Sequence, residues 1–283
     1  MNVSITLVPR GGLANRMRAI ASAVALSTRI GANLCVVWIR TSDLSASFSD
    51  LFLDDNLPFR LKELPRRHFA YLPHRGKYLY LPTFWQNMRY SSTLRDERKQ
   101  DRSYLIGAKP ESVYAFFRSV RSGSVFVDTC HEFYPYTPEL YRSLFRPSAK
   151  VEKRISALLH PEPGRAQPTG LHIRRTDHID SIQSSPLSMF EDTIRQYLAS
   201  DSGCRFYLAT DDDATKERLK TLFPGHIITS PATASRSTLQ GMIDGAAEMF
   251  ALSKCSSIIG SFQSSYSEAA AILGNISLKI IKI

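Results

Sequence analysis

The sequence predicts an α/β protein with two doubly wound domains that face each other across a cleft. Two patterns carry this prediction: residues 3–39 run strand, helix, strand, and residues 169–283 alternate strictly between apolar strand-like runs and helices. A third pattern separates them, because residues 160–168 (HPEPGRAQP) hold three prolines and one glycine, a composition typical of linkers. The expected domains are therefore residues 1–160 and 161–283.

The first domain begins with a βαβ unit. Residues 3–8 (VSITLV) are rich in β-branched side chains and predict a buried strand. After a Gly-Gly break, apolar positions recur at intervals of three and four from Leu13 to about Ile30, which is typical of one helix face, and Gly31 is a stop signal. Residues 33–39 (NLCVVWI) form the second strand. Because a helix connects the two strands, we expect them to be parallel.

Residues 43–122 are rich in Arg, Tyr, Pro and Ser, and we treat them as an irregular insertion. Between Arg60 and Arg102, eleven Lys or Arg stand against four acidic residues, so this stretch carries +7 of the formal charge of +10. Two interpretations stay open, an acceptor-binding surface and a solvated basic loop. The aromatic residues interleaved with these charges are Tyr71, Tyr78, Tyr80, Trp85 and Tyr90.

The remaining elements follow from the same patterns. In the first domain, a strand is expected over residues 124–129, with helices over 138–145 and 149–159. In the second domain, the expected strands are 169–174, 205–211, 226–230, 256–260 and 277–283. The expected helices between them are 187–198, 213–222, 238–253 and 264–273. This alternation implies a parallel sheet covered by helices on both faces.

Composition limits the class of protein. The chain of 283 residues is 43% hydrophobic and 22% charged, as in ordinary globular proteins, and its pI of about 9.5 favours phosphate-bearing ligands, polyanions or anionic membrane surfaces. No signal peptide and no apolar run of roughly 18 residues is present, so we expect a cytoplasmic protein with the option of peripheral binding to an anionic membrane. The four cysteines lie far apart without a C-x-x-C pair, which predicts buried free thiols.

Ligands of parallel α/β sheets sit beyond the carboxyl ends of the strands, so the side chains at those ends are the candidates. In LHIRRTD (171–177), strand alternation places His172 and Arg174 on one side and Arg175 on the other. Arg174 can then reach a phosphate while Arg175 pairs with protein carboxylates. The alternative is a pair of surface arginines, with Asp177 capping the next segment.

Three further segments hold candidate ligand-binding residues. Asp211 ends a strand in YLATDDD, where it either binds or simply caps the next helix. Asp244, in the helix over 238–253, either accepts hydrogen bonds from a purine edge or faces solvent. In GSFQSSYSEAA (260–270), Ser261, Ser264 and Ser265 at a helix start form either a phosphate cradle or ordinary caps.

The Gly-Gly turn of the first domain, GGLANRM (11–17), lacks the spacing of a nucleotide-binding fingerprint. We expect Asn15 and Arg16 to reach a ligand across the cleft and Arg18 to be structural. No P-loop, G-x-G-x-x-G, G-x-S-x-G or H-E-x-x-H motif occurs, and the seven histidines show no metal-ligand spacing. Phosphate would then be bound by arginine and helix ends, without an obligatory metal.

Taken together, these segments resemble the fucosyltransferase superfamily, which includes bacterial nodulation, core α1,6-, α1,2- and protein O-fucosyltransferases. HIRRTD (172–177), YLATDD (207–212) and GSFQSSYSEAA (260–270) are similar to its three ordered motifs, and GGLANRM (11–17) to its N-terminal motif. The resemblance implies a GT-B architecture of two Rossmann-like domains, an N-terminal acceptor domain and a C-terminal domain that binds GDP-fucose. It implies no cofactor or metal, only the nucleotide-sugar donor and a glycan or glycolipid acceptor.

The resemblance also implies roles for the candidate residues. Arg174 would hold the β-phosphate, and His172 and Asp244 would flank the guanine. The position of the catalytic acid of core α1,6 enzymes is Ile182 here, so Asp180, the nearest acid, would replace it as the base. The other donor-site residues implied are Arg175 and Asp211, which would organise the site, and Ser261, Ser264 and Ser265, which would lie by the diphosphate.

These observations predict an inverting, metal-independent glycosyltransferase of bacterial carbohydrate biosynthesis that transfers fucose from GDP-fucose to a glycan or glycoconjugate. One alternative is a non-catalytic relative that binds the nucleotide sugar, which the missing acid at Ile182 keeps open. The other is a basic nucleic-acid-binding protein, which charge and aromatic residues favour. Nucleic acid is not the expected partner, because no RRM, KH or helix-turn-helix signature occurs.

Overall fold

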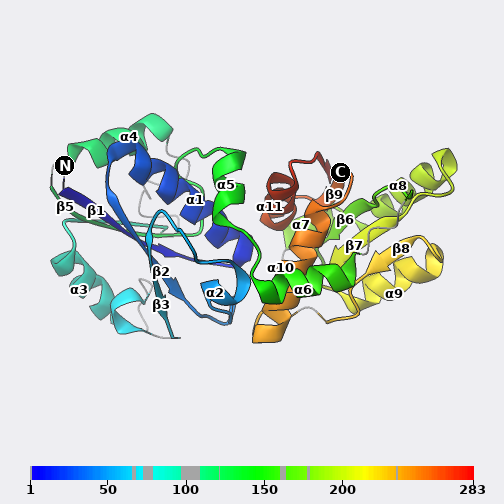
Figure 1. The fold of residues 1–283 in the computed structure, drawn as a ribbon, viewed down its shortest axis with the longest axis horizontal. Coiled ribbons are helices and arrows are strands. Elements are labelled where there is room, and N and C mark those ends of the chain that lie inside the picture. The colour runs from blue at the N-terminus through cyan, green and yellow to red at the C-terminus, as the bar shows by residue number, and fades with distance from the viewer. Residues whose placement is uncertain are drawn as a thin grey trace. The chain divides into compact units, whose positions relative to one another are not determined.

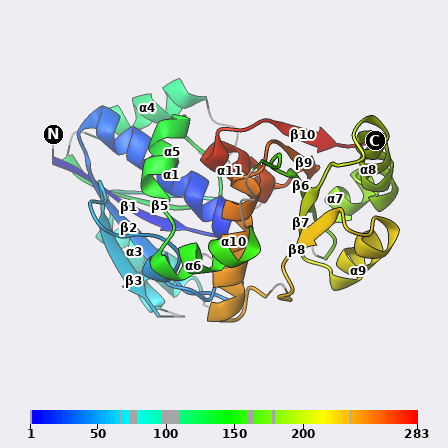
Figure 2. The same ribbon diagram turned by 45° about the vertical axis from the view of Figure 1, so that its right-hand side comes forward.

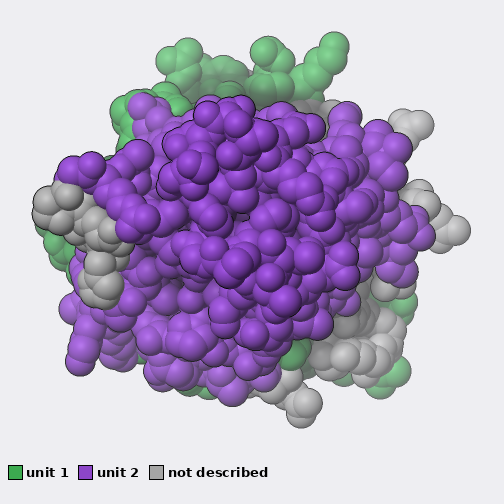
Figure 3. Space-filling view, turned by 90° about the vertical axis from the view of Figure 1, so that its right-hand side faces the viewer, with its two compact units in different colours: residues 1–146 green, residues 147–283 purple. Residues whose placement is uncertain are grey.

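The structure is a computed structural model of the chain. It describes residues 2–65, 68–72, 79–96, 109–120, 122–159, 164–176, 179–233 and 235–283. Three residues named above, Tyr78, Arg102 and Asp177, lie outside these ranges. The chain divides into two compact units, Met1–Arg146 and Pro147–Ile283, which are coloured separately in Figure 3.

The first unit is built on a parallel sheet in the order β3-β2-β1-β5-β4 (Figure 1). Its strands are β1 (Asn2–Pro9), β2 (Asn33–Ile39), β3 (Arg60–Leu64), β4 (Ser92–Arg95) and β5 (Ser122–Thr129). Its helices are α1 (Leu13–Ile30), α2 (Phe48–Leu51), η1 (Phe69–Tyr71, a 3-10 turn), α3 (Leu81–Arg89), α4 (Pro110–Ser119) and α5 (Pro138–Leu144).

The βαβ unit of the first 39 residues is confirmed, including its parallel strands. β1 pairs with β2 on one side and with β5 on the other, which buries it in the middle of the sheet. α1 ends where Gly31 takes the left-handed conformation and its N–H bonds the last turn. The predicted strand and helices over 124–159 are also confirmed.

The insertion predicted over residues 43–122 is only partly irregular, because it supplies both edge strands, β3 and β4. Edge strands bury few side chains: β3 is polar and mostly exposed, and β4 has four residues, so neither gives the apolar signal of a buried strand. The aromatic residues divide as well. Tyr71 is buried and Tyr90 packs on Phe126, whereas Tyr80 and Trp85 are exposed.

The second unit is a doubly wound parallel sheet in the order β10-β9-β6-β7-β8, which is the order of a classic Rossmann fold, 3-2-1-4-5, read from the other edge. Its strands are β6 (Thr169–Ile173), β7 (Phe206–Thr210), β8 (Ile227–Thr229), β9 (Ile258–Ser261) and β10 (Leu278–Ile281). Its helices are α6 (Ala149–Leu158), α7 (Ile179–Ser184), α8 (Leu187–Ser200), α9 (Asp213–Leu222), α10 (Leu239–Ser253) and α11 (Ser265–Gly274).

The two faces of this sheet are covered differently (Figure 2). On one face, Leu171 and Leu208 join an apolar core with side chains of α8 and α9. On the other face lie α10 and α11, and Gly170 lets α10 come so close that a Cβ there would lie 2.9 Å from Leu252. His172 alternates with Leu171 along β6 and therefore faces α11, where its ring stacks on Tyr266.

The boundary between the units differs from the sequence-based one. The predicted division after residue 160 puts α6 in the first domain, whereas the structure divides the chain between Arg146 and Pro147. The physical reason is packing, since the buried residues Val151 and Ile155 lie on α6, which packs against α10 of the second unit.

Most other elements of the second unit match their predicted ranges. The helix α7 was not predicted, because its six residues are too few to show a helical period. All four cysteines are free as expected, but Cys255 is the buried one and the other three are half-buried. None of the helices within the described residues is long and apolar enough to cross a membrane.

Candidate functional site

The candidate site of the second unit lies where its strand order reverses. The chain leaves β6 toward β7 on one side, while β9 pairs with β6 on the other side. A gap between the two loops at such a point is the usual ligand position in open α/β sheets. Here the two loops are residues 174–176 after β6 and 262–264 after β9. Each loop holds part of one of the three motifs found in the sequence, HIRRTD (172–177) and GSFQSSYSEAA (260–270).

His172 stands at this point in a fully internal environment. Its Nδ1 lies 3.1 Å from Ser264 Oγ, and its ring stacks on Tyr266 with centroids 4.7 Å apart. Burial lowers the pKa of His172 to about 4, and the positive charge of Arg174 adds to this effect against the opposing effect of Asp211. His172 is therefore neutral at physiological pH and keeps one donor and one acceptor nitrogen.

The loop after β6 is fixed from both neighbouring strands. The backbone N–H of Arg174 donates to Ser261 Oγ at 3.1 Å. On the other side, Asp211 accepts the backbone N–H of Arg175 at 2.7 Å and the hydroxyl of Thr176 at 2.6 Å. The half-buried Arg174 is thus carried on a backbone with few ways to move. Asp211 is not a helix cap, because Asp212 is the residue that caps α9. The carboxylate of Asp211 instead holds the loop after β6.

The side chain of Arg175 departs from its expected pairing with carboxylates. Its Nη2 donates to the backbone oxygen of Ser185 at 3.0 Å, and the described residues place no carboxylate within ion-pair distance of its guanidinium. Burial is the main cause that lowers its pKa. The predicted direction of the Arg175 side chain relied on strand alternation, which does not apply to Arg175 because β6 ends at Ile173. Arg175 anchors the loop to the segment before α8.

The three predicted serines have different surroundings. Ser261 is fully buried, and its hydroxyl bonds the backbone of Arg174 and of His172. Ser264 is also buried and points to His172, so its side chain does not cap α11. Ser265 is the half-buried first residue of α11. An anion at this loop would meet the first-turn amides of α11 without a competing side-chain cap from Ser264.

Asp244 is buried at 7% exposure, so the interpretation as a solvent-facing acid is wrong. Its Oδ1 accepts from Arg154 Nε at 2.5 Å and from Gln240 Nε2 at 3.3 Å. One turn further along α10, Glu248 is also buried, and burial raises the pKa of Glu248 to about 7. α10 thus carries two neighbouring acids: Arg154 of α6 pairs directly with Asp244, and the positive charges of Lys216 and Arg154 act on Glu248.

Tyr266 connects these two parts of the site. Its ring stacks on His172 at the switch point, and its hydroxyl donates to Gly245 O at 2.5 Å, next to Asp244. His172 and Asp244 do not contact each other directly, but Tyr266 links His172 to the turn of α10 that carries Asp244. Arg154 and Tyr266 were missed in the sequence. Tyr266 lies inside a motif that was found, whereas Arg154 has no local signal.

The proposed base, Asp180, is in the first turn of α7 and is exposed. Ile182, at the position of the catalytic acid of core α1,6 enzymes, is half-buried. Within the described residues, no hydrogen bond joins Asp180 to His172 or Arg174. The structure therefore brings Asp180 near neither of them through a direct contact, and its role stays a prediction.

The strand order of the first unit also reverses beside β1, between β1 and β5. Here Arg10 forms a two-pronged ion pair with Asp128, with both N–O distances 2.7 Å. Gly11 has a φ of 76°, and a Cβ there would lie 3.0 Å from the side-chain nitrogen Nδ2 of Asn15. Arg18 donates to Cys130 O at 3.0 Å. The Gly-Gly turn is thus held against the end of β5.

Arg16 is buried at 1% exposure, which argues against its expected contact with a ligand. Its guanidinium donates to Gly11 O at 2.9 Å, Ile39 O at 2.7 Å and Thr41 Oγ1 at 3.0 Å, and it lies over the ring of Trp38. Burial lowers the pKa of Arg16 to about 9. Consecutive residues of a helix point in directions about 100° apart, so the side chain of Arg16 points away from that of Asn15 and into the core of the first unit. Asn15 is half-buried and has no hydrogen bond from its side chain within the described residues.

No protein-family model and no curated protein matches this sequence. Solved structures do match. NodZ α1,6-fucosyltransferase soaked with GDP-fucose is 15% identical with a TM-score of 0.63, over 96% of this chain and 93% of that chain. A variant of Arabidopsis thaliana FUT1 in complex with GDP is 14% identical with a TM-score of 0.62, over 99% and 70%. POFUT1 in complex with GDP is 12% identical with a TM-score of 0.57, over 100% and 99%.

These likenesses extend over nearly the whole chain, and they show the fold at identities of 12–16%. The predicted GT-B-like class of two Rossmann-like units is confirmed. The chain forms two parallel sheets, and a single alignment to the NodZ structure covers 96% of the chain that forms them. The chain has the fold of these fucosyltransferases.

Proposed function

We propose that this chain, which has the fold of solved fucosyltransferases, is an inverting, metal-independent glycosyltransferase that transfers fucose from GDP-fucose to a glycan or glycoconjugate. One observation carries the proposal: the three sequence motifs meet at the switch point of the second unit through direct hydrogen bonds. Ser261 and Ser264 of the third motif bond Arg174 and His172 of the first, and Asp211 of the second bonds the same loop. Such convergence is typical of a nucleotide site.

The residues of the switch point suit a nucleoside diphosphate. As the bond between fucose and GDP breaks, negative charge grows on the diphosphate. A fixed positive group beside the diphosphate stabilises this charge and so lowers the activation barrier of bond breaking. Arg174 supplies the charge and the amides of α11 supply donors. His172, neutral and immobile, and the carboxylate of Asp244 would flank the guanine, whose ring edge offers N–H donors to a carboxylate. Arg175 and Asp211 hold the loop in place, and Ser261, Ser264 and Ser265 lie along it.

Inversion at the sugar requires a base that takes the proton of the acceptor hydroxyl. We assign this role to Asp180, which is exposed and so open to an acceptor, and which is the first acid in the sequence after the first motif. Asn15, on the turn of the first unit, is proposed to contact the donor. Arg16 has no place in this proposal because its guanidinium is already bonded inside the first unit.

The acceptor side of the proposal has support in α3. Its neighbouring residues Leu79 and Tyr80 and its own Leu81, Phe84 and Met88 are large, apolar and more than half exposed. Arg89 lies on the same helix and belongs to the basic stretch found in the sequence. A face that combines apolar and basic side chains suits a glycolipid acceptor at an anionic membrane surface.

Donor binding is tested by thermal shift and calorimetry with GDP, UDP and ADP. We expect GDP to stabilise the protein more than UDP or ADP, and Arg174→Ala to remove most of that effect. The matched control is Arg195→Ala, which removes an exposed arginine of the same unit paired with Asp192 on α8. Equal affinity for GDP in the wild type and in Arg174→Ala would contradict the proposed donor site, and stabilisation only by oligonucleotides would favour the nucleic-acid alternative.

Transfer is tested separately from binding. We expect release of GDP from GDP-fucose in the presence of glycan or glycolipid acceptors, without added metal. In Asp180→Asn we expect kcat to fall by at least tenfold, with the GDP affinity unchanged. Binding of GDP without turnover of any acceptor or of water would identify the non-catalytic relative instead.

A further inference from the structure

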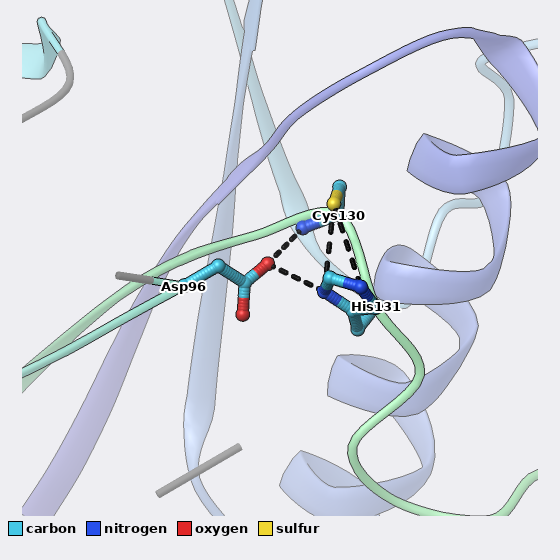
Figure 4. A group of neighbouring side chains, drawn as sticks. All are labelled: Asp96, Cys130 and His131. Carbon is cyan, nitrogen blue, oxygen red and sulfur yellow. Dashed lines mark hydrogen bonds and ion pairs between the residues drawn. The ribbon is translucent and has the colours of Figure 1, made fainter. Parts of the chain in front are cut away.

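Three potential metal ligands lie together in the first unit, beside the Gly-Gly turn (Figure 4). Asp96 follows the end of β4, and Cys130 and His131 follow the end of β5, which pairs with β4. Their ligand atoms all lie within 4.8 Å of one another. Cys130 Sγ is 3.4 Å from His131 Nδ1, and that nitrogen is 2.9 Å from Asp96 Oδ2.

This donor set has the chemistry of a zinc-class site. Thiolate, imidazole and carboxylate are the three side-chain ligands that zinc uses, at about 2.0–2.3 Å each. Two such ligands around one tetrahedral ion lie about 3.3–3.7 Å apart. The separations of 3.4 Å and 2.9 Å are close to this range, and the third pair, the Cys130 sulfur and an Asp96 carboxylate oxygen, lies within 4.8 Å, so side-chain rotations that shorten this third separation would bring the three atoms onto one ion.

The surrounding residues hold the ligands in place. Asp96 Oδ2 accepts the hydroxyl of Thr129 and the backbone N–H of Cys130, both at 2.6 Å. The other carboxylate oxygen, Oδ1, is buried without a hydrogen bond among the described residues. On the far side, Arg18 Nε donates to Cys130 O at 3.0 Å. Outer contacts of this kind orient ligands and raise metal affinity.

We propose that Asp96, Cys130 and His131 bind one divalent cation of the zinc class, with the fourth position open to water or an anionic ligand. The side chain of His131 is 38% exposed and that of Asp96 is 14% exposed, so the cluster is accessible from solvent. The sequence alone gave no such signal because Asp96 is 34 residues away from Cys130. All three ligands belong to the first unit, and the presence of this site does not depend on the proposed function.

The competing interpretation is a hydrogen-bonded cluster in which a proton, not a metal, joins His131 to Asp96. The two interpretations differ in what a thiol ligand does. A cobalt ion bound by Cys130 gives a thiolate-to-metal charge-transfer band and intense visible d–d bands of tetrahedral geometry. A cluster without metal affinity gives neither.

The test is titration of the purified, reduced full-length protein with cobalt chloride, followed by displacement with zinc sulfate. We expect saturation at one equivalent, the charge-transfer band, and its loss on addition of zinc. Cys130→Ser should abolish the band, and His131→Gln and Asp96→Ala should weaken cobalt binding by at least tenfold. The matched control is Cys204→Ser, because the Cys204 thiol also faces an acid, Asp201, at 3.4 Å, whereas the nearby His226 bonds the backbone oxygen of Cys204 and not its thiol.

Absence of saturable cobalt binding in the wild-type protein would overturn the proposal, as would an unchanged band in Cys130→Ser. Circular dichroism checks that each variant is folded. If Cys130→Ser fails to fold, His131→Gln and Asp96→Ala test the proposal in its place. Unchanged cobalt affinity in both of these variants would contradict the metal site. All of these measurements are made without nucleotide, so failure of the metal site leaves the donor-site proposal untouched.

Discussion

The rings of His172 and Tyr266 stack with centroids 4.7 Å apart and an angle of 28° between their planes. The pair links β6 with α11, and the Tyr266 hydroxyl extends the link to α10 through Gly245 O. One side chain therefore positions both the histidine at the switch point and the part of α10 that carries Asp244. This relationship gives a first prediction for the proposed donor site.

Removal of the Tyr266 hydroxyl should loosen α10 from α11. Tyr266→Phe keeps the stack on His172 and loses a buried hydrogen bond, so we expect the free energy of unfolding to fall by about 1 kcal/mol. GDP affinity should fall several-fold because Asp244 is less well held. Thermal unfolding and calorimetry measure the two effects. A variant that loses stability but binds GDP as well as the wild type would show that Tyr266 only supports the core.

Asp211 and Asp212 are neighbours with separable roles. Asp211→Ala removes the acceptor of the Arg175 and Thr176 backbone amides, and we expect GDP affinity to fall by at least tenfold. Asp212→Ala removes the cap of α9 and should cost about 1 kcal/mol of stability without a change in GDP affinity. The two variants are compared by calorimetry and denaturant unfolding. Equal losses of affinity in both would contradict the assignment.

Glu248 should make stability depend on pH. Its folded pKa of about 7 lies above the ordinary value of 4.5, so its contribution is complete below pH 4.5 and is lost as the pH rises through 7. The net loss amounts to roughly 3 kcal/mol, because the effect of burial exceeds the opposing effect of the positive charges of Lys216 and Arg154. Denaturant unfolding across this range, wild type against Glu248→Gln, isolates the effect from that of His172.

In Glu248→Gln the side chain cannot ionise. We therefore expect this variant to gain stability relative to the wild type as the pH rises from 4.5 to 7, and to keep that gain above 7. A difference between the two proteins that is the same at every pH would show that Glu248 keeps an ordinary pKa in the fold.

Asn15 and Arg16 should separate ligand binding from folding. Arg16→Ala removes three hydrogen bonds of a buried guanidinium, and we expect a loss of stability of about 3 kcal/mol or more. Asn15→Ala should leave stability within about 0.5 kcal/mol, because its side chain is half-buried, and lower GDP affinity. If Asn15→Ala and Arg18→Ala bind GDP as the wild type does, the first unit does not contact the donor through this turn.

The exposed apolar side chains of α3 should mediate contact with lipid. Phe84→Ser and Met88→Ser together remove two side chains that are 66% and 74% exposed. We expect reduced co-sedimentation with vesicles of phosphatidylcholine and phosphatidylserine, and unchanged GDP binding. The control pair is Leu222→Ser and Leu239→Ser, exposed apolar residues of the second unit. If the α3 variant, the control variant and the wild type bind vesicles equally, the exposed side chains of α3 do not mediate contact with lipid.

The buried strands and the helices between them were predictable from the sequence. β1, β2 and β6 are apolar because both faces of each are covered, and the helices show their period over ten or more residues. β3, β4 and α7 were not predictable, because edge strands and a six-residue helix bury too little to leave a pattern. The unit boundary was misplaced because linker composition does not reveal which partner α6 packs against.

For the candidate site, the sequence by itself determined which segments end at the carboxyl edge of the sheet, and so identified His172, Arg174, Asp211 and the serine loop. Only the tertiary structure decided what each side chain faces. It buried Arg16 in the first unit, turned Arg175 to a backbone oxygen, and paired Asp244 with Arg154. The reason is physical: strand periodicity fixes a side chain's direction only within the strand, and contacts between distant segments depend on how the helices pack.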